Sequence, residues 1–186
     1  RLALQEDGLV VLAGTSVTLG NVTSLDGGVN TVSSRVSDAV FTSENGLGTL
    51  NGGVYTAGST PGTDTIQIYS PSLDLYGTAQ IHVVSALSGL TVTRSGSNAA
   101  LSSLSLDSGE SVSLTATGTY WSRTALRSGS GGVTWNVTGN IGTITQDGVF
   151  TASGNGTSGT ITATAGGVTT SVAVTLNRAY VHTDVP

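Results

Sequence analysis

The amino-acid sequence predicts an all-β chain folded as two tandem β-sandwich domains. Three observations predict this fold class: the composition, an alternation of apolar and polar residues with a period of two, and an internal repeat. Apolar residues make up 37% of the 186 residues and charged residues only 9%, and there are 27 glycines. Because Thr and Val suit half-buried strands and Gly suits tight turns, this composition is typical of an all-β protein.

Several segments alternate strictly between apolar and polar residues, as half-buried strands do. The alternating segments are Ser111–Ala116, Thr160–Ala165 and Ser171–Leu176. Glycine-containing turn signals separate the expected strands at Asn51-Gly52-Gly53, Asp147-Gly148 and Gly166-Gly167. Many short strands at this spacing indicate a sandwich, and no segment follows the helical period.

An internal repeat divides the chain. Gly14–Leu19 recurs 95 residues later as Gly109–Leu114, and Gly53–Ala57 recurs at the same offset as Gly148–Ala152. A period this long indicates a duplicated domain and not a solenoid repeat. We therefore predict one domain at residues 2–84, a linker at 85–89, a second domain at 90–176 and a tail at 177–186. The stretch from Asn21 to Val36 has no clear counterpart in the second unit.

The charge pattern argues against a nucleic-acid partner. The formal net charge is −5, and the six basic residues are all arginines that do not cluster. Phosphate binding requires concentrated Lys or Arg, so a nucleic-acid role is excluded. No apolar run reaches the ~18 residues of a membrane span. The chain has no cysteine, so neither disulfides nor thiolate metal sites are available.

The second unit resembles a known family. It carries Val133-Thr134-Trp135-Asn136-Val137, then Asp147-Gly148-Val149-Phe150-Thr151-Ala152, and ends in strands rich in Thr and Val. This pattern resembles the bacterial immunoglobulin-like domains of the invasin/intimin type, called group 2. The first unit is similar, with Phe41 in place of Trp135 and Tyr55 in place of Phe150. The resemblance implies an immunoglobulin-like sandwich in each unit.

The tail resembles a second family. Tyr180-Val181-His182-Thr183-Asp184-Val185-Pro186 is similar to the opening of an S-layer homology module. The resemblance implies a bacterial protein held at the cell wall by modules beyond Pro186, with a further domain upstream. The chain also begins in mid-pattern without a signal peptide, which we interpret as a fragment of a longer protein.

The ionisable residues predict no active site, cofactor or metal ion. Alternation places His82 on the outer face of the last strand of the first unit, and His182 lies in the tail. No Gly-x-Ser-x-Gly elbow surrounds any serine. A calcium ion at a domain junction, held by Asp107 or Glu110 with backbone carbonyls, is a minor alternative, because no loop carries the alternating oxygen ligands of a dedicated site. We predict that the chain is not an enzyme.

The aromatic residues fall into two groups. Trp135, Phe150, Phe41 and Tyr55 occupy strand positions expected to pack between the sheets. Tyr120 and Trp121 are adjacent, and neighbours on a strand face opposite sides, so one of these rings is expected to be exposed. With Arg123 and Arg127 nearby, they form the candidate ligand-contact patch. The alternative is one ring in the core and one covering a sheet edge.

The predicted function is a non-catalytic spacer or interaction module of a bacterial cell-surface protein, displaying an upstream domain away from the cell wall. The alternative is an adhesin module that binds a glycan or a host surface protein through its exposed aromatic face. Cell-wall polysaccharide is expected as a partner only through adjacent modules. The chain is expected to be an extracellular monomer without nucleic-acid or membrane partners.

Overall fold

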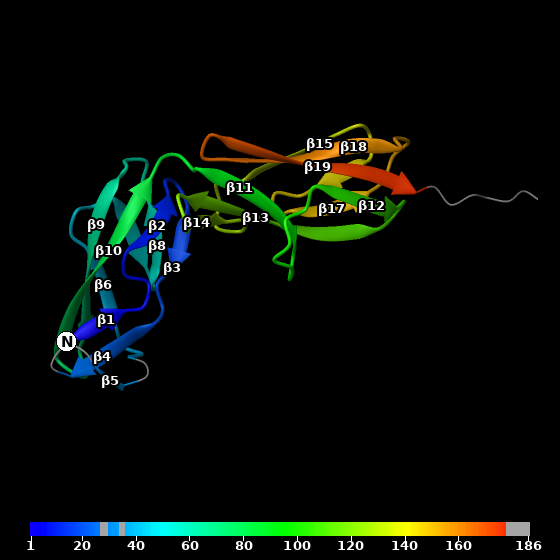
Figure 1. The fold of residues 1–186 in the computed structure, drawn as a ribbon. Coiled ribbons are helices and arrows are strands. Elements are labelled where there is room, and N and C mark those ends of the chain that lie inside the picture. The colour runs from blue at the N-terminus through cyan, green and yellow to red at the C-terminus, as the bar shows by residue number, and fades with distance from the viewer. Residues whose placement is uncertain (27–29, 34–35, 178–186) are drawn as a thin grey trace, which may run out of the picture.

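A computed structural model of the chain describes residues 1–26, 30–33 and 36–177, which form strands and turns (Figure 1). None of these residues belongs to a helix that could cross a membrane. The predicted all-β fold class is confirmed. The end of the tail, including the residues similar to an S-layer homology module and His182, lies outside the described residues.

The strands up to Val84 form the first sandwich. They are β1 (Leu2–Leu4), β2 (Leu9–Leu12), β3 (Ser16–Thr18), β4 (Val22–Asp26), β5 (Asn30–Ser33), β6 (Val40–Ser43), β7 (Gly48–Asn51), β8 (Val54–Ala57), β9 (Gly62–Ser70) and β10 (Leu75–Val84). One layer is the sheet β2-β10-β9-β6, in which β2 runs parallel to β10. The sheets β1-β4-β5 and β3-β8-β7 form the opposite layer.

The strands from Gly89 onward form the second sandwich. They are β11 (Gly89–Arg94), β12 (Ser103–Asp107), β13 (Ser111–Tyr120), β14 (Arg123–Arg127), β15 (Thr134–Thr138), β16 (Gly142–Ile144), β17 (Val149–Ala152), β18 (Ser158–Ala165) and β19 (Val168–Asn177). One layer is β12-β19-β18-β15, with β12 parallel to β19, and the other contains β11, β13, β17, β16 and β14. The described part of the chain is thus two tandem immunoglobulin-like β-sandwiches.

Strand register shows which residues correspond in the two sandwiches. Phe41 pairs with Ile68 on β9, and Trp135 pairs with Ala163 on β18, 95 residues further on. Tyr55 and Phe150 likewise occupy matching positions on β8 and β17, opposite Val17 and Val112. The repeat detected in the sequence is therefore a correspondence of strands.

The first sandwich contains a hairpin that sequence comparison did not align. Residues within 21–36 form the β4–β5 hairpin, whose register shifts between Ser24 and Leu25. The β13–β14 hairpin of the second sandwich shifts between Gly118 and Thr119 in the same way. In the first sandwich the strand preceding this hairpin is interrupted between β3 and β4, and this interruption obscures the likeness in sequence.

The predicted core aromatics are buried in three of four cases. Tyr55, Phe150 and Trp135 are buried, while Phe41 is only partly buried and packs against the core of the first sandwich. The smaller Phe ring lies on β6, the edge strand of its sheet, where one side lacks a covering strand. The remaining core residues are aliphatic and come from the inward positions of each strand.

The two sandwiches meet at an apolar junction (Figure 1). Val10 and Leu12 of β2 belong to the same buried cluster as Leu126 of β14 and Ala165 of β18. Leu87, between β10 and β11, belongs to this cluster as well, and its backbone N–H donates to the Gly166 carbonyl at 2.9 Å. The core of the second sandwich therefore continues into the first.

Candidate ligand-contact surface at the junction of the sandwiches

The β13–β14 hairpin carries the predicted contact residues and reaches across the junction. β14 packs against β2 of the first sandwich, with Ala125 and Leu126 buried. The Ser16 N–H of the first sandwich donates to the Ser130 carbonyl just beyond β14 at 3.0 Å. The register shift after Gly118 bends the hairpin, as β-bulges do, and it directs the tip towards the first sandwich.

Trp121 lies at the tip of this hairpin with an unusual backbone conformation. Its φ is 56°, a left-handed value that bulky residues seldom adopt. The Trp121 N–H donates to Ser88 Oγ at 2.7 Å, and this hydroxyl donates to the Thr119 carbonyl at 3.0 Å. Trp121 is 81% exposed. Ser88, in the connection between the sandwiches, thus helps to hold the indole in solvent.

Both aromatic rings of the patch are exposed, not one. Sequence alternation required Tyr120 and Trp121 to lie on one continuing strand, but β13 ends at Tyr120 and Trp121 belongs to the turn. Tyr120 is 37% exposed. The sequence contains the signal for this turn, because Trp121 and Ser122 separate two alternating segments by a hairpin's two-residue loop.

The tip of the hairpin and the first sandwich enclose a shallow hollow of about 450 Å³. Tyr120, Trp121 and Arg123 line it from the second sandwich, and Thr63 and His82 line it from the first. The structure therefore brings three of the four predicted contact residues to one place. Arg127 lines two other hollows, one at the junction beside Val11 and one over the sheet of β11 and β13.

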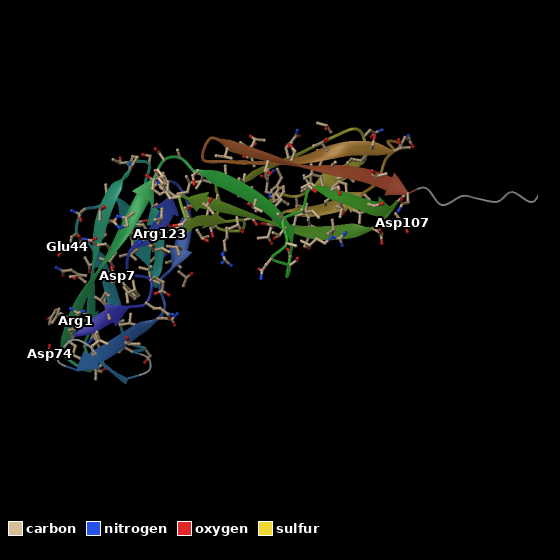
Figure 2. All side chains as sticks on the ribbon, in the orientation of Figure 1. Arg1, Asp7, Glu44, Asp74, Asp107 and Arg123 are labelled. Carbon is tan, nitrogen blue, oxygen red and sulfur yellow. The ribbon has the colours of Figure 1, made fainter. Side chains whose placement is uncertain are left out.

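Arg123 serves the junction directly (Figure 2). Its Nη1 donates to the carbonyl of Gly8, in the turn before β2, at 2.5 Å. A charged donor on a backbone carbonyl is among the stronger hydrogen bonds in proteins. Arg123 consequently has a structural partner, and only its remaining N–H groups are available to a ligand.

The other candidate residues lie apart from this hollow or serve the fold. His82 faces outward as predicted, and its Nδ1 lies 2.9 Å from Thr63 Oγ1. Asp107 lies at the end of the second sandwich remote from the first (Figure 2), and its N–H donates to Glu110 Oε2 at 2.7 Å. Neither carboxylate is at the junction described here. Residues 1–26, 30–33 and 36–177 contain no cluster of three or more His, Asp or Glu suited to a metal ion.

One buried polar cluster escaped the sequence analysis. Asp64 is fully buried in the first sandwich and accepts a hydrogen bond from Tyr55 OH at 2.9 Å. Ser43 Oγ donates to both carboxylate oxygens at 2.8 and 2.9 Å, and the Asn45 N–H donates at 3.2 Å. Burial, and then the Asp64 carboxylate, raise the pKa of Tyr55 far above its usual value. The cluster is enclosed and fully paired, which favours a structural role.

Two exposed tyrosines were also missed. Tyr69 and Tyr76 stack on the outer face of the first sandwich with ring centroids 4.5 Å apart and an interplanar angle of 26°. Partial burial, together with the neighbouring Tyr76 and Asp74, raises the pKa of Tyr69. The signal was present, because Tyr69 follows Ile68 and Ile66 out of phase and must therefore point away from the core.

Comparison with known proteins identifies no family. No family model matches the chain, and no curated protein matches it. Among solved structures, domains 5–6 of the S-layer protein SbsC align at 19% identity and a TM-score of 0.39, covering 96% of this chain and 97% of that one. SbsC domains 4 and 5 align at 15% identity and a TM-score of 0.35, covering 95% and 96%.

A chimeric titin Z1Z2 aligns at 14% identity and a TM-score of 0.35, covering 96% of each chain. At TM-scores this low, none of these alignments carries a conclusion about fold or function. The class of protein follows from the sheets themselves, which are two immunoglobulin-like sandwiches joined by an apolar contact.

Proposed function

We propose that the chain is a non-catalytic spacer of a bacterial cell-surface protein and that it works as a stiff, bent pair of domains. The proposed domains span residues 2–84 and 90–176, with a linker at 85–89. The assignment to bacterial group 2 immunoglobulin-like domains, the extracellular location and the wall-binding module beyond the chain rest on the sequence resemblances. In this proposal the chain is a monomer that holds an upstream domain away from the wall.

The observation that carries the proposal is the shared core at the junction. A spacer transmits position only if its domains do not swing freely, and domains joined by a short linker alone would swing. Here Val10 and Leu12 of the first sandwich are buried in the cluster of the second. The hydrogen bonds from Arg123 to Gly8 and from Ser16 to Ser130 add directional contacts on the hairpin side.

Distance measurements between the two sandwiches test this proposal. The chain contains no cysteine, so the substitutions Thr42→Cys and Thr162→Cys supply unique sites for a pair of spin labels. We expect a single narrow distance distribution for the otherwise unchanged chain. A broad distribution would show that the sandwiches move independently and would overturn the stiff spacer.

Two adjacent glycines provide a matched pair of variants. Gly166 and Gly167 share the β18–β19 turn and have φ values of 52° and 78°. A Cβ at Gly166 would lie 2.6 Å from Leu87 Cγ and 3.1 Å from Leu12 Cδ1, whereas a Cβ at Gly167 meets nothing within 4 Å. We expect Gly166→Ala to broaden or shift the distance distribution. Gly167→Ala carries a similar backbone strain and should leave the distribution unchanged.

A further inference from the structure

The outer face of the β9–β10 pair combines uncharged polar side chains with exposed aromatic rings at both ends. Its outward positions on β9 and β10 carry no charged residue. Tyr69 and Tyr76 stand at the end remote from the junction, and Trp121 of the β13–β14 hairpin stands at the junction end. This face is additional to the spacer role, because it contributes nothing to the junction core.

The tyrosine end is a preformed aromatic platform. Tyr69 and Tyr76 are directly opposite each other on β9 and β10, so their rings project from the same side of the sheet. The stacked Tyr76 ring is 63% exposed. Val40, opposite Tyr69 on β6, is also exposed and extends the apolar surface by one strand. Exposed rings in this number have no role in the core of a monomer.

The middle of the face offers hydrogen-bonding groups without charge. Gln67 is opposite Thr78, and Thr63 is opposite His82. The Thr63 hydroxyl and His82 Nδ1 are hydrogen-bonded to each other at 2.9 Å, which orients the imidazole. Gln67 Nε2 donates to the carboxylate of Glu44, so the nearest acidic group already has a partner.

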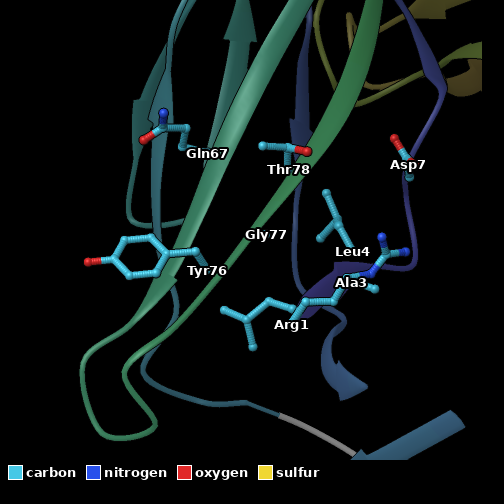
Figure 3. Close-up of a pocket in the computed structure, with 9 residues that line it drawn as sticks. Arg1, Ala3, Leu4, Asp7, Gln67, Tyr76, Gly77 and Thr78 are labelled. Atoms are coloured by element: carbon cyan, nitrogen blue, oxygen red, sulfur yellow. The ribbon is translucent and has the colours of Figure 1, made fainter. Parts of the chain in front are cut away.

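Two hollows lie along this strand pair, one at each aromatic end. The hollow beside Tyr76 measures about 590 Å³ and is bordered by Gln67 and Thr78 (Figure 3). Arg1 and Asp7 border it on the side of β1. The hollow beside Trp121 is bordered by Thr63 and His82. A ligand lying along β10 from Tyr76 to His82 would span about 20 Å and reach both hollows.

The second sandwich supplies an internal comparison. By strand register, the Tyr69–Tyr76 pair corresponds to Thr164 and Thr169, whose hydroxyls lie 2.9 Å apart. The Gln67–Thr78 pair corresponds to Thr162 and Ser171. The same sheet is thus uncharged and polar in both sandwiches, but only the first carries aromatic rings. The aromatic rings are therefore not a requirement of the fold.

We propose that this face of the first sandwich binds an extended, neutral saccharide chain. The C–H faces of sugar rings pack on aromatic faces, and sugar hydroxyls pair with amide, hydroxyl and imidazole groups such as those of Gln67, Thr78 and His82. An uncharged face with separated rings offers nothing to select an anionic polymer and no continuous apolar surface for a protein core. Tyr76 and Trp121 would bind sugar units at the two ends.

An array of neutral and charged glycans, followed by calorimetric titration with the neutral oligosaccharides that bind, tests this proposal on the complete chain. We expect binding that strengthens from disaccharide to hexasaccharide and that is insensitive to salt. Trp121 is the exposed one of the two tryptophans, so its fluorescence should change on binding. Tyr76→Thr and Trp121→Ala should each weaken binding by about threefold to tenfold.

Thr169→Ala is the matched control, because it changes the equivalent pair on the second sandwich and should leave binding unchanged. Binding to no neutral glycan, or only to charged glycans, would overturn the proposal. Concentration-dependent dimerisation that Tyr76→Thr abolishes would assign the face to a second copy of this chain instead, and would also overturn it. None of these results depends on the distance between the two sandwiches, so the spacer proposal stands or fails separately.

Discussion

The two sandwiches share a strand register but fill one central position differently. Tyr55 of the first and Phe150 of the second are both fully buried, and each ring lies over a glycine, Gly48 or Gly142. The rings differ by a single hydroxyl group. In the first sandwich this hydroxyl donates to Asp64 at 2.9 Å, and the carboxylate takes further hydrogen bonds from Ser43.

The matching positions of the second sandwich lack this network. Register places Val137 where the first sandwich has Ser43, and Gly159 where it has Asp64. A buried hydroxyl without an acceptor is costly, so the additional oxygen of Tyr55 requires a partner, and the buried carboxylate that serves it requires further donors. The difference teaches that a polar atom in a sandwich core is retained as part of a set.

Removal of the carboxylate should have the largest effect on this comparison. Asp64→Ala leaves the donors on Tyr55, Ser43 and Asn45 without their acceptor. We expect the free energy of unfolding of the first sandwich to fall by about 2–4 kcal/mol. Native-state hydrogen exchange of the β9 and β10 amides measures this change. Glu44→Ala, at an exposed carboxylate on the same sheet, should change it by less than about 0.5 kcal/mol.

The reciprocal change in the second sandwich should come next. Phe150→Tyr introduces the hydroxyl of the first sandwich where register offers only Val137 and Gly159. We expect it to lower the free energy of unfolding of the second sandwich by about 1–3 kcal/mol. Both tryptophans, Trp121 and Trp135, belong to the second sandwich, so tryptophan fluorescence during denaturation follows this unfolding step. An unchanged midpoint would mean that the sandwich core accommodates an unpaired hydroxyl.

Alkaline pH should separate the two sandwiches without mutation. Burial and Asp64 raise the pKa of Tyr55 above its ordinary value of 10.0, so the folded chain keeps the phenol proton that the unfolded chain loses. The resulting stability is complete below pH 10 and falls as the pH rises above that value. Hydrogen exchange corrected for its intrinsic pH dependence should show this loss in the first sandwich. Tyr55→Phe should remove the loss, and a loss that persists in this variant would assign it to another group.

Much of the fold could be predicted from the sequence because it depends on local pattern. Alternation located the strands, and the repeat aligned Tyr55 with Phe150 before any coordinates were available. Asp64 was predictable in principle, because it is in phase with Ile66 and Ile68 on β9 and must point inward. The same phase places Tyr69 outward. These residues were missed because charge suggested a surface position for Asp64 and ring size suggested the core for aromatics.

The contact surface could be predicted only in part. Tyr120, Trp121 and Arg123 were selected as neighbours in sequence, and they do gather around one hollow. Their setting, however, depends on Gly8, Thr63 and His82, which lie on other strands and in the other sandwich. No local pattern states which segments of one domain will meet a hairpin of the next. The apolar residues of β2 carried no mark that distinguished a junction from an ordinary core.

The smallest expected effect concerns Ser43, the outermost member of the network. Ser43→Val imports the residue of the second sandwich, removes two donations to Asp64 and removes the acceptor of the Gly46 N–H. Because the site is only partly buried and Tyr55 still donates to Asp64, we expect a loss of about 1 kcal/mol in the first sandwich. The double variant with Tyr55→Phe should depart from the sum of the single losses, since both residues share one carboxylate. Additive losses in hydrogen exchange would instead mean that the two hydroxyls act independently and that the set is not cooperative.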